Sequence, residues 1–179
     1  GKARWGTDQF LTFSTRSTDG GRTWRSIGPP IEVFRCGTEP YGQGLVQPFS
    51  REILALGFQG SDEPGANAAA GIAFSADAGK TWGKPIVLGK YKHIFSGGGV
   101  TVDETSGAIL VFAEKYKWPE NPPPPTVYRS TDHGRTWNTQ DTVIHPSKNG
   151  ERLTMHMAEH GITLQRGRHK GRLLRPARY

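Results

Sequence analysis

Cysteine is almost absent from this chain of 179 residues, in which Cys36 stands alone. A single cysteine excludes an internal disulfide and leaves the redox compartment open. There is no run of about 18 apolar residues, and no basic segment leads into an apolar one, so the sequence predicts neither a membrane span nor an export signal. A signal peptide lost upstream would make the expected location secreted or periplasmic.

Helical periodicity is also missing, because no convincing stretch repeats apolar residues at intervals of three and four. The chain instead has 24 glycines, 13 prolines and 5 tryptophans, and 34% of its residues are hydrophobic. This composition is typical of a turn-rich all-β protein. The Gly28-Pro29-Pro30 segment is expected to end the first unit. The candidate strands cover residues 9–16, 44–49, 52–58, 71–75, 99–103, 108–113, 126–129, 160–165 and 172–179.

One eight-residue motif occurs three times, with the pattern S-x-D-x-G-x-T-W. It reads STDGGRTW at 17–24, SADAGKTW at 75–82 and STDHGRTW at 130–137. The motif aspartates recur at intervals of 58 (77 − 19) and 55 (132 − 77) residues. Intervals of roughly 40–50 residues or slightly more indicate an array of supersecondary units.

The motif has a physical interpretation as a structural turn. Its Asp can accept hydrogen bonds from nearby backbone N–H groups, its Gly can take a positive φ at little cost, and its Trp is large enough to pack between neighbouring sheets. Turn formation is the ordinary role of such an Asp, so three catalytic carboxylates are not expected. The predicted structural residues are Asp19, Trp24, Asp77, Trp82, Asp132 and Trp137.

The repeats predict a β-propeller whose blades have four antiparallel strands. The expected blade pieces are about 1–28, 29–88, 89–145 and 146–179, or three and a half blades. A closed propeller needs about 4–8 blades, so we expect the chain to be part of a larger protein. Open blade edges are sites of strand pairing, and self-association through them is expected.

The chain after the third motif resembles one protein family. HGITL at 160–164 and GRLLRPAR at 171–178 are similar to a strand pair that follows the second blade in sialidases, and the repeated motif resembles their Asp box. The resemblance implies a six-bladed propeller and an exo-α-sialidase-like glycoside hydrolase acting on terminal sialic acids of glycoconjugates, without metal or other cofactor. The alternative is a non-catalytic Asp-box propeller that binds carbohydrate or protein.

Sialidases use arginines to bind the sugar carboxylate, an Asp as acid/base and a Tyr activated by a Glu. Two registers compete. In the preferred one Arg35 is the first of these arginines and Asp62 the acid/base, although Arg35 precedes Cys-Gly-Thr where the family has Ile-Pro-Ala. In the other, Asp8 is the acid/base. Neither supplies the Tyr/Glu pair, so the chain alone is not expected to hydrolyse sialosides. The further residues implied at the pocket are Glu159, His160, Arg175, Arg178 and Tyr179.

The formal net charge of +7 favours an anionic partner, which the resemblance makes a sugar or glycoconjugate. The basic segment 166–178 has no acidic residue, but aromatic residues that would stack on bases are nearly absent, so a solvated hairpin is favoured over a nucleic-acid site. The segment from His156 to His160 matches H-x-x-E-H, yet that zinc motif requires a helix and this stretch precedes a strand.

Overall fold

The computed structural model describes residues 12–31, 42–47, 49–59, 68–91, 95–115, 126–151, 153 and 159–177. No helix occurs among these residues, and hence none that could cross a membrane. The strands are β1 (Thr12–Arg16), β2 (Arg25–Ile31), β3 (Gly42–Val46), β4 (Ile53–Gln59), β5 (Ala68–Ser75), β6 (Ile86–Tyr91), β7 (Phe95–Val102), β8 (Ile109–Lys115), β9 (Thr126–Ser130), β10 (Asn138–Asp141), β11 (Ile162–Thr163) and β12 (Leu173–Leu174).

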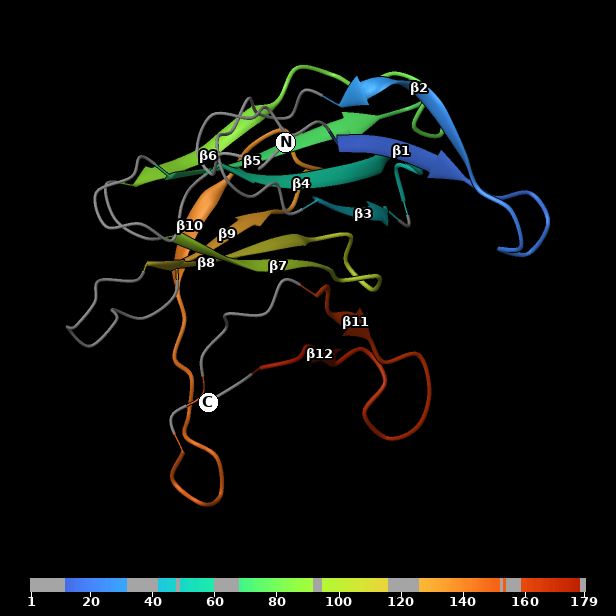
Figure 1. Cartoon of the computed structure of the whole chain (residues 1–179). Coiled ribbons are helices and arrows are strands. Elements are labelled where there is room, and N and C mark those ends of the chain that lie inside the picture. The colour runs from blue at the N-terminus through green and yellow to red at the C-terminus, as the bar shows by residue number, and fades with distance from the viewer. Residues whose placement is uncertain are drawn as a thin grey trace, which may run out of the picture.

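These strands form four antiparallel sheets in which sequence neighbours pair (Figure 1). β1 pairs with β2, and β11 with β12. The two complete sheets have the strand orders β3-β4-β5-β6 and β10-β9-β8-β7. The sheets follow one another along the chain, and the all-β fold predicted from the sequence is confirmed.

Alternation of side chains gives the sheet β7–β10 two apolar faces. Ile109 and Val111 of β8 point to one face and Phe112 to the other, as expected when successive residues of a strand point to opposite sides. The register pairs Val102 with Ile109 and Val100 with Val111, so apolar residues of β7 and β8 reinforce the same face. A sheet with two apolar faces needs a neighbour on each side.

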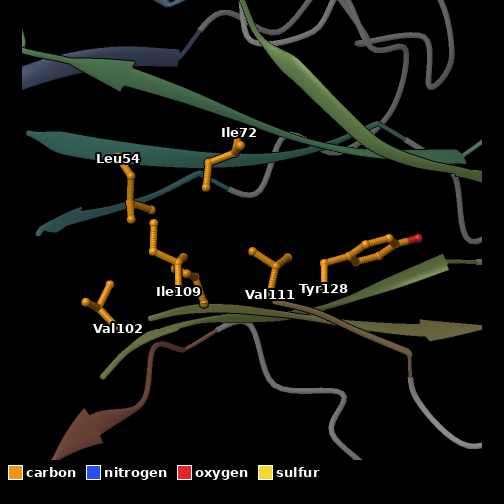
Figure 2. Packing of buried hydrophobic residues seen from close by; sticks show 7 residues of the cluster. Leu54, Ile72, Val102, Ile109, Val111 and Tyr128 are labelled. Atoms are coloured by element: carbon orange, nitrogen blue, oxygen red, sulfur yellow. The ribbon is translucent and has the colours of Figure 1, made fainter. Parts of the chain in front are cut away.

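The main core lies between the two complete sheets. In Figure 2 the side chains of Leu54 and Ile72 point towards those of Ile109 and Val111 in the other sheet. All four are fully buried, and burial of one such side chain stabilises by about 1.5–3 kcal/mol. The cluster consists of Leu54, Ile72, Val100, Val102, Ile109, Val111 and Tyr128.

The opposite face of the sheet β7–β10 holds a smaller cluster around Phe112 and Val127, with Leu110 and Ile144 packed against it. On this side the chain of the fourth sheet is attached to β7. The Gly161 N–H donates to the Val100 carbonyl at 3.1 Å, and the Thr163 hydroxyl donates to the Val102 carbonyl at 3.2 Å. Residues 161–163 therefore run alongside β7 in the same direction.

Two predicted boundaries were wrong. Gly28, Pro29 and Pro30 do not end the first unit but lie inside β2. Ser14 pairs with Ile27 and Thr12 with Ile31, so extra residues of β2 are accommodated at an irregularity where Gly28 has φ 69°. Among the strands that the structure describes, β2 pairs with β1 alone, and proline is tolerated in edge strands and bulges.

The second correction concerns the fourth sheet, whose strands are much shorter than 160–165 and 172–179. β11 and β12 have two residues each, pairing Ile162 with Leu174 and Thr163 with Leu173. Immediately beyond Thr163 the backbone enters the turn that joins the two strands, closed by hydrogen bonds between Leu164 and Arg172 and between Gly171 and Leu164. The strand pairing thus gives way to the turn after fewer residues than the alternation of apolar and polar side chains predicts.

Antiparallel order divides the connections between two edges of the sheets. The connections β1–β2, β3–β4, β5–β6, β7–β8, β9–β10 and β11–β12 lie on one, which we call the Asp-box edge because the three motifs are there. Contacts link neighbouring turns along it: a Cβ on Gly107 would stand 2.6 Å from the Phe49 ring and 3.6 Å from His133. β4 ends and β5 begins at the opposite edge.

Candidate functional site

The third motif shows how the repeated turn is built. Asp132 accepts hydrogen bonds from the Thr136 N–H at 2.9 Å and the Thr136 hydroxyl at 2.6 Å. The Ser130 hydroxyl donates to Asp132 at 2.8 Å and accepts the Gly134 N–H at 2.8 Å. Asp and Ser thus satisfy several polar groups of the turn, as predicted for a structural role.

The first and second motifs repeat this arrangement with nearly the same distances. The Thr23 N–H and hydroxyl donate to Asp19 at 2.9 and 2.6 Å, and those of Thr81 donate to Asp77 at 2.8 and 2.5 Å. One local sequence therefore gives one geometry in three places.

Each motif also contains two consecutive residues with positive φ. The second is always glycine, with φ 86° at Gly134 and 84° at Gly79. The first is Gly20, Ala78 or His133, with φ between 60° and 71°. Non-glycine residues adopt a positive φ at a cost in free energy. The hydrogen bonds of the turn therefore hold the backbone in this conformation.

The hydrogen bonds lower the pKa of the motif carboxyls. The Thr23 hydroxyl, then the Thr23 N–H and Ser17, bring the pKa of Asp19 to about 2. The Thr81 hydroxyl does the same for Asp77, whose pKa is also about 2, and the Thr136 hydroxyl holds the pKa of Asp132 well below its usual range. These carboxylates stay ionised at neutral pH, which suits permanent acceptors and not a general acid.

The depressed pKa values predict acid sensitivity of the turns. A carboxyl with a folded-state pKa near 2 and an ordinary value of 3.8 contributes stability that is fully present above about pH 4 and is lost as the pH falls through 2. In urea unfolding between pH 2 and 6, Thr81→Val is expected to flatten this part of the profile, whereas Thr139→Val on β10 should leave its shape unchanged. Identical profiles for Thr81→Val and the unaltered chain would contradict the assignment.

The motif tryptophans differ in packing. Trp137 packs against the main core and donates its indole N–H to the Gly134 carbonyl at 3.0 Å. Trp82 is half-buried, and its indole nitrogen is buried without an acceptor. Trp24 donates to Gly21 at 3.0 Å but remains 62% exposed. The prediction that the motif Trp packs between neighbouring sheets therefore holds for Trp137. It fails for Trp24, because no described element covers the outer side of β1 and β2.

Two motifs lie against the sheet that precedes them. A Cβ on Gly28 of β2 would stand 2.3 Å from the Lys80 carbonyl oxygen in the second motif. A Cβ on Gly134 in the third motif would stand 2.2 Å from the tip of the Phe74 ring on β5. Glycine permits both approaches, so the motifs fix the separation of successive sheets.

Five of the residues predicted for substrate binding or catalysis lie outside the described residues: Asp8, Arg35, Asp62, Arg178 and Tyr179. The choice between the two registers stays a prediction. The strands on either side of Asp62 are β4 and β5, whose adjoining ends, Gln59 and Ala68, lie at the edge opposite the Asp boxes.

The described candidates lie next to the fourth sheet. Glu159 and His160 precede β11, and both are exposed. Arg175 follows β12 and is half-buried, with its guanidinium carbon 4.1 Å from the centroid of the Phe112 ring and its Nε donating to the Pro176 carbonyl at 3.4 Å. The structure thus places Arg175 over the smaller core cluster, a contact that holds the chain after β12 against the sheet β7–β10.

Sequence reasoning missed the residues that attach the fourth sheet. Thr163 is buried, donates to Val102 and accepts the Glu104 N–H at 2.9 Å. In the sequence Thr163 lies between two apolar residues, Ile162 and Leu164. This pattern predicts a strand but does not indicate which strand Thr163 contacts. Among the described residues, no cluster of His, Cys, Asp and Glu could hold a metal ion.

Comparisons with known proteins bear on the fold. A family model described as BNR/Asp-box repeat matches residues 128–139, and no curated protein matches the chain. Among solved structures, the Hadza microbial sialidase Hz136 has TM-score 0.48 and 22% identity over 70% of this chain and 30% of its own. An α-L-arabinanase of Penicillium chrysogenum, solved with arabinobiose, has TM-score 0.50 and 15% identity over 89% of this chain and 46% of its own.

Both solved structures are glycosidases with β-propellers, and the chain spans less than half of the length of either. The arabinanase likeness extends over most of the chain and agrees with the succession of antiparallel sheets. The repeat model falls on the third motif and its flanking strands. Residues 128–139 thus match a BNR/Asp-box repeat, and the chain has an all-β fold of successive antiparallel sheets like that of the β-propeller glycosidases.

Proposed function

We propose that the chain is part of an exo-α-sialidase-like glycoside hydrolase acting on terminal sialic acids. The observation that carries the proposal is the strand pair β11–β12, in which Ile162 and Thr163 of the segment HGITL pair with Leu174 and Leu173 of GRLL, next to β7. This pair stands after the third Asp box, where the resemblance to sialidases requires it.

The chemistry of the substrate determines which residues are needed. Sialic acid has a carboxylate on its anomeric carbon, and a guanidinium group can bind that carboxylate with two parallel hydrogen bonds. Arg35 is proposed for this role, with Glu159, His160, Arg178 and Tyr179 lining the pocket. Arg175 is proposed to position Arg178 and Tyr179, because it holds the end of β12 on Phe112.

Proton transfer is assigned to Asp62, with Asp8 as the alternative. The described aspartates of the Asp boxes are unsuited to this step, since Asp19, Asp77 and Asp132 are committed to their turns. A general acid must release and regain a proton near the working pH. The Tyr/Glu nucleophile pair is expected from residues outside this chain.

Hydrolysis of a fluorogenic sialoside tests the proposal. The protein containing this chain should turn the substrate over, whereas residues 1–179 alone should not. Asp62→Asn should lower kcat/KM about 100-fold, within the usual contribution of an acid/base, and under the other register Asp8→Asn should do so. Glu104→Gln removes a negative charge at the Asp-box edge and is the control. Absence of turnover by the whole protein would refute the sialidase assignment.

A non-catalytic binding module is the second candidate. It is favoured by the commitment of Asp19, Asp77, Asp103 and Asp132 to turn hydrogen bonds, which leaves these described aspartates without a catalytic role. Calorimetric titration of the whole protein with sialyllactose and with linear arabino-oligosaccharides separates the candidates. Binding without hydrolysis supports the module, and binding of the arabino-oligosaccharide alone shifts the substrate class to neutral pentose polymers.

A further inference from the structure

The turn that joins β11 to β12, residues 164–172, has a backbone fixed by its own hydrogen bonds. The Leu164 N–H donates to the Arg172 carbonyl at 2.9 Å, and the Gly171 N–H donates to Leu164 at 2.8 Å. Two bonds cross its tip, from Lys170 to Gly167 and from Arg172 to His169, both at 3.1 Å. We call this segment the basic hairpin. A ligand would meet an ordered backbone, which lowers the entropy lost on binding.

Four cations project from the basic hairpin: Arg166, Arg168, Lys170 and Arg172 are all exposed. Residues 166–177 contain no acidic residue. None of the four cations forms an ion pair with the residues that the structure describes. The neighbouring Glu104 carboxylate accepts the Gln165 amide at 2.6 Å and so fixes the base of the hairpin. The cations are therefore available to an external anion.

The Asp boxes on the same edge also carry cations, but they have no net positive charge. Each Asp box has a cation two residues before its Trp, at Arg22, Lys80 and Arg135, and all three are exposed. The box carboxylates are bonded within their own turns and stay ionised, so each balances the charge of the cation in its box. Among these turns, the excess of positive charge is therefore confined to the basic hairpin. The turn bearing Glu104 lies near both the third box and the basic hairpin: a Cβ on Gly107 would stand 3.6 Å from His133, and a Cβ on Gly171 would stand 3.6 Å from the Thr105 hydroxyl.

We propose that the basic hairpin binds a sulfated polysaccharide. Four cations within seven residues favour a partner with high charge density. A highly sulfated chain such as heparin carries more than one charge for each sugar, whereas a uronic or sialic acid polymer carries one at most. Guanidinium groups also match oxyanions with two parallel donors. Nucleic acid is the less suitable polyanion, since residues 159–177 contain no Phe, Tyr or Trp on which a base could stack.

The basic hairpin lies at the edge opposite the adjoining ends of β4 and β5, which flank Asp62. A polymer held there leaves the other edge accessible. The inference concerns attachment and stands independently of the proposed hydrolase activity.

Fluorescence anisotropy with a labelled heparin octasaccharide tests the proposal. The test variant replaces Arg166, Arg168, Lys170 and Arg172 with serine. The control variant replaces the equally exposed Arg16, Arg25, Lys84 and Lys148 with serine, which gives the same change in net charge. At 100 mM NaCl the test variant should bind at least tenfold more weakly than the unaltered protein, with a reduced dependence on salt, and the control less than threefold more weakly.

Equal losses in both variants would show attraction by net charge alone and overturn the proposal, as would absence of heparin binding by the unaltered protein. Tighter binding of duplex DNA than of heparin, lost in the test variant, would identify a nucleic-acid partner instead. Thermal melting of each variant checks its folding. Turnover of a small sialoside should not differ between the variants, so failure of this proposal is distinguishable from failure of the hydrolase proposal.

Discussion

Replacing Ile109 with alanine is expected to lower the free energy of unfolding by about 3–4 kcal/mol. Its side chain is fully buried between the two complete sheets, where it faces Leu54 and Ile72. Truncation removes apolar contacts from both sheets and leaves a cavity, and substitutions of this kind cost about 2–5 kcal/mol. Urea unfolding followed by tryptophan fluorescence measures the loss.

Val143→Ala is the matched control, since Val143 is 79% exposed and its truncation should cost less than about 0.5 kcal/mol. The double variant Ile109→Ala, Leu54→Ala tests whether the two sheets form one cooperative unit. Residues that share a cluster commonly couple by about 0.5–3 kcal/mol. Strict additivity, or a loss at Ile109 no larger than at Val143, would contradict the packing of one sheet on the other.

Gly134→Ala is expected to destabilise the protein by about 2–5 kcal/mol for two separate reasons. The residue has φ 86°, a conformation that costs a non-glycine residue about 1–2 kcal/mol. The added Cβ would also stand 2.2 Å from the tip of the Phe74 ring, and overpacking of this kind costs about 1–3 kcal/mol. Urea unfolding again gives the loss.

Gly150→Ala isolates the first reason. Gly150 has φ 84°, and a Cβ there would meet nothing within 4 Å, so only the backbone cost of about 1–2 kcal/mol applies. The excess loss at Gly134 then measures the close approach of the third Asp box to β5, and Phe74→Leu should recover part of it. Equal losses at the two glycines would exclude a steric contact between the box and the preceding sheet.

The sequence predicts the Asp boxes well because each is built from contacts within eight residues. Ser130, Asp132 and Thr136 supply the donors and acceptors that close the turn, and Gly134 supplies the positive φ. The all-β fold follows from repeated motifs and alternation for a similar reason, since both are local patterns.

Features that depend on distant partners could not be predicted in the same way. Pro29 and Pro30 indicate the end of a strand locally, and they fit in β2 because that strand has one partner among the described strands and an irregular register. The exposure of Trp24 depends on which element covers β1 and β2. The stacking of Arg175 on Phe112 joins residues far apart in sequence, and no periodic pattern announces it.

The candidate site was the least predictable part. Its residues were inferred from a family resemblance, and Arg35 and Asp62 lie outside the described residues. Turn and strand patterns specify positions along the backbone, whereas a binding site requires the placement of side chains from several connections at once.

Gly28 lies close to Lys80, and Gly134 lies close to Phe74, so successive sheets are held together at the Asp-box edge. Both close approaches set the spacing between successive sheets at this edge. Connections at the other edge take no part in these two approaches. They can therefore change in length and sequence while the spacing at the Asp-box edge is kept. A single scaffold of this kind can thus present different sets of loops without redesign of its sheets.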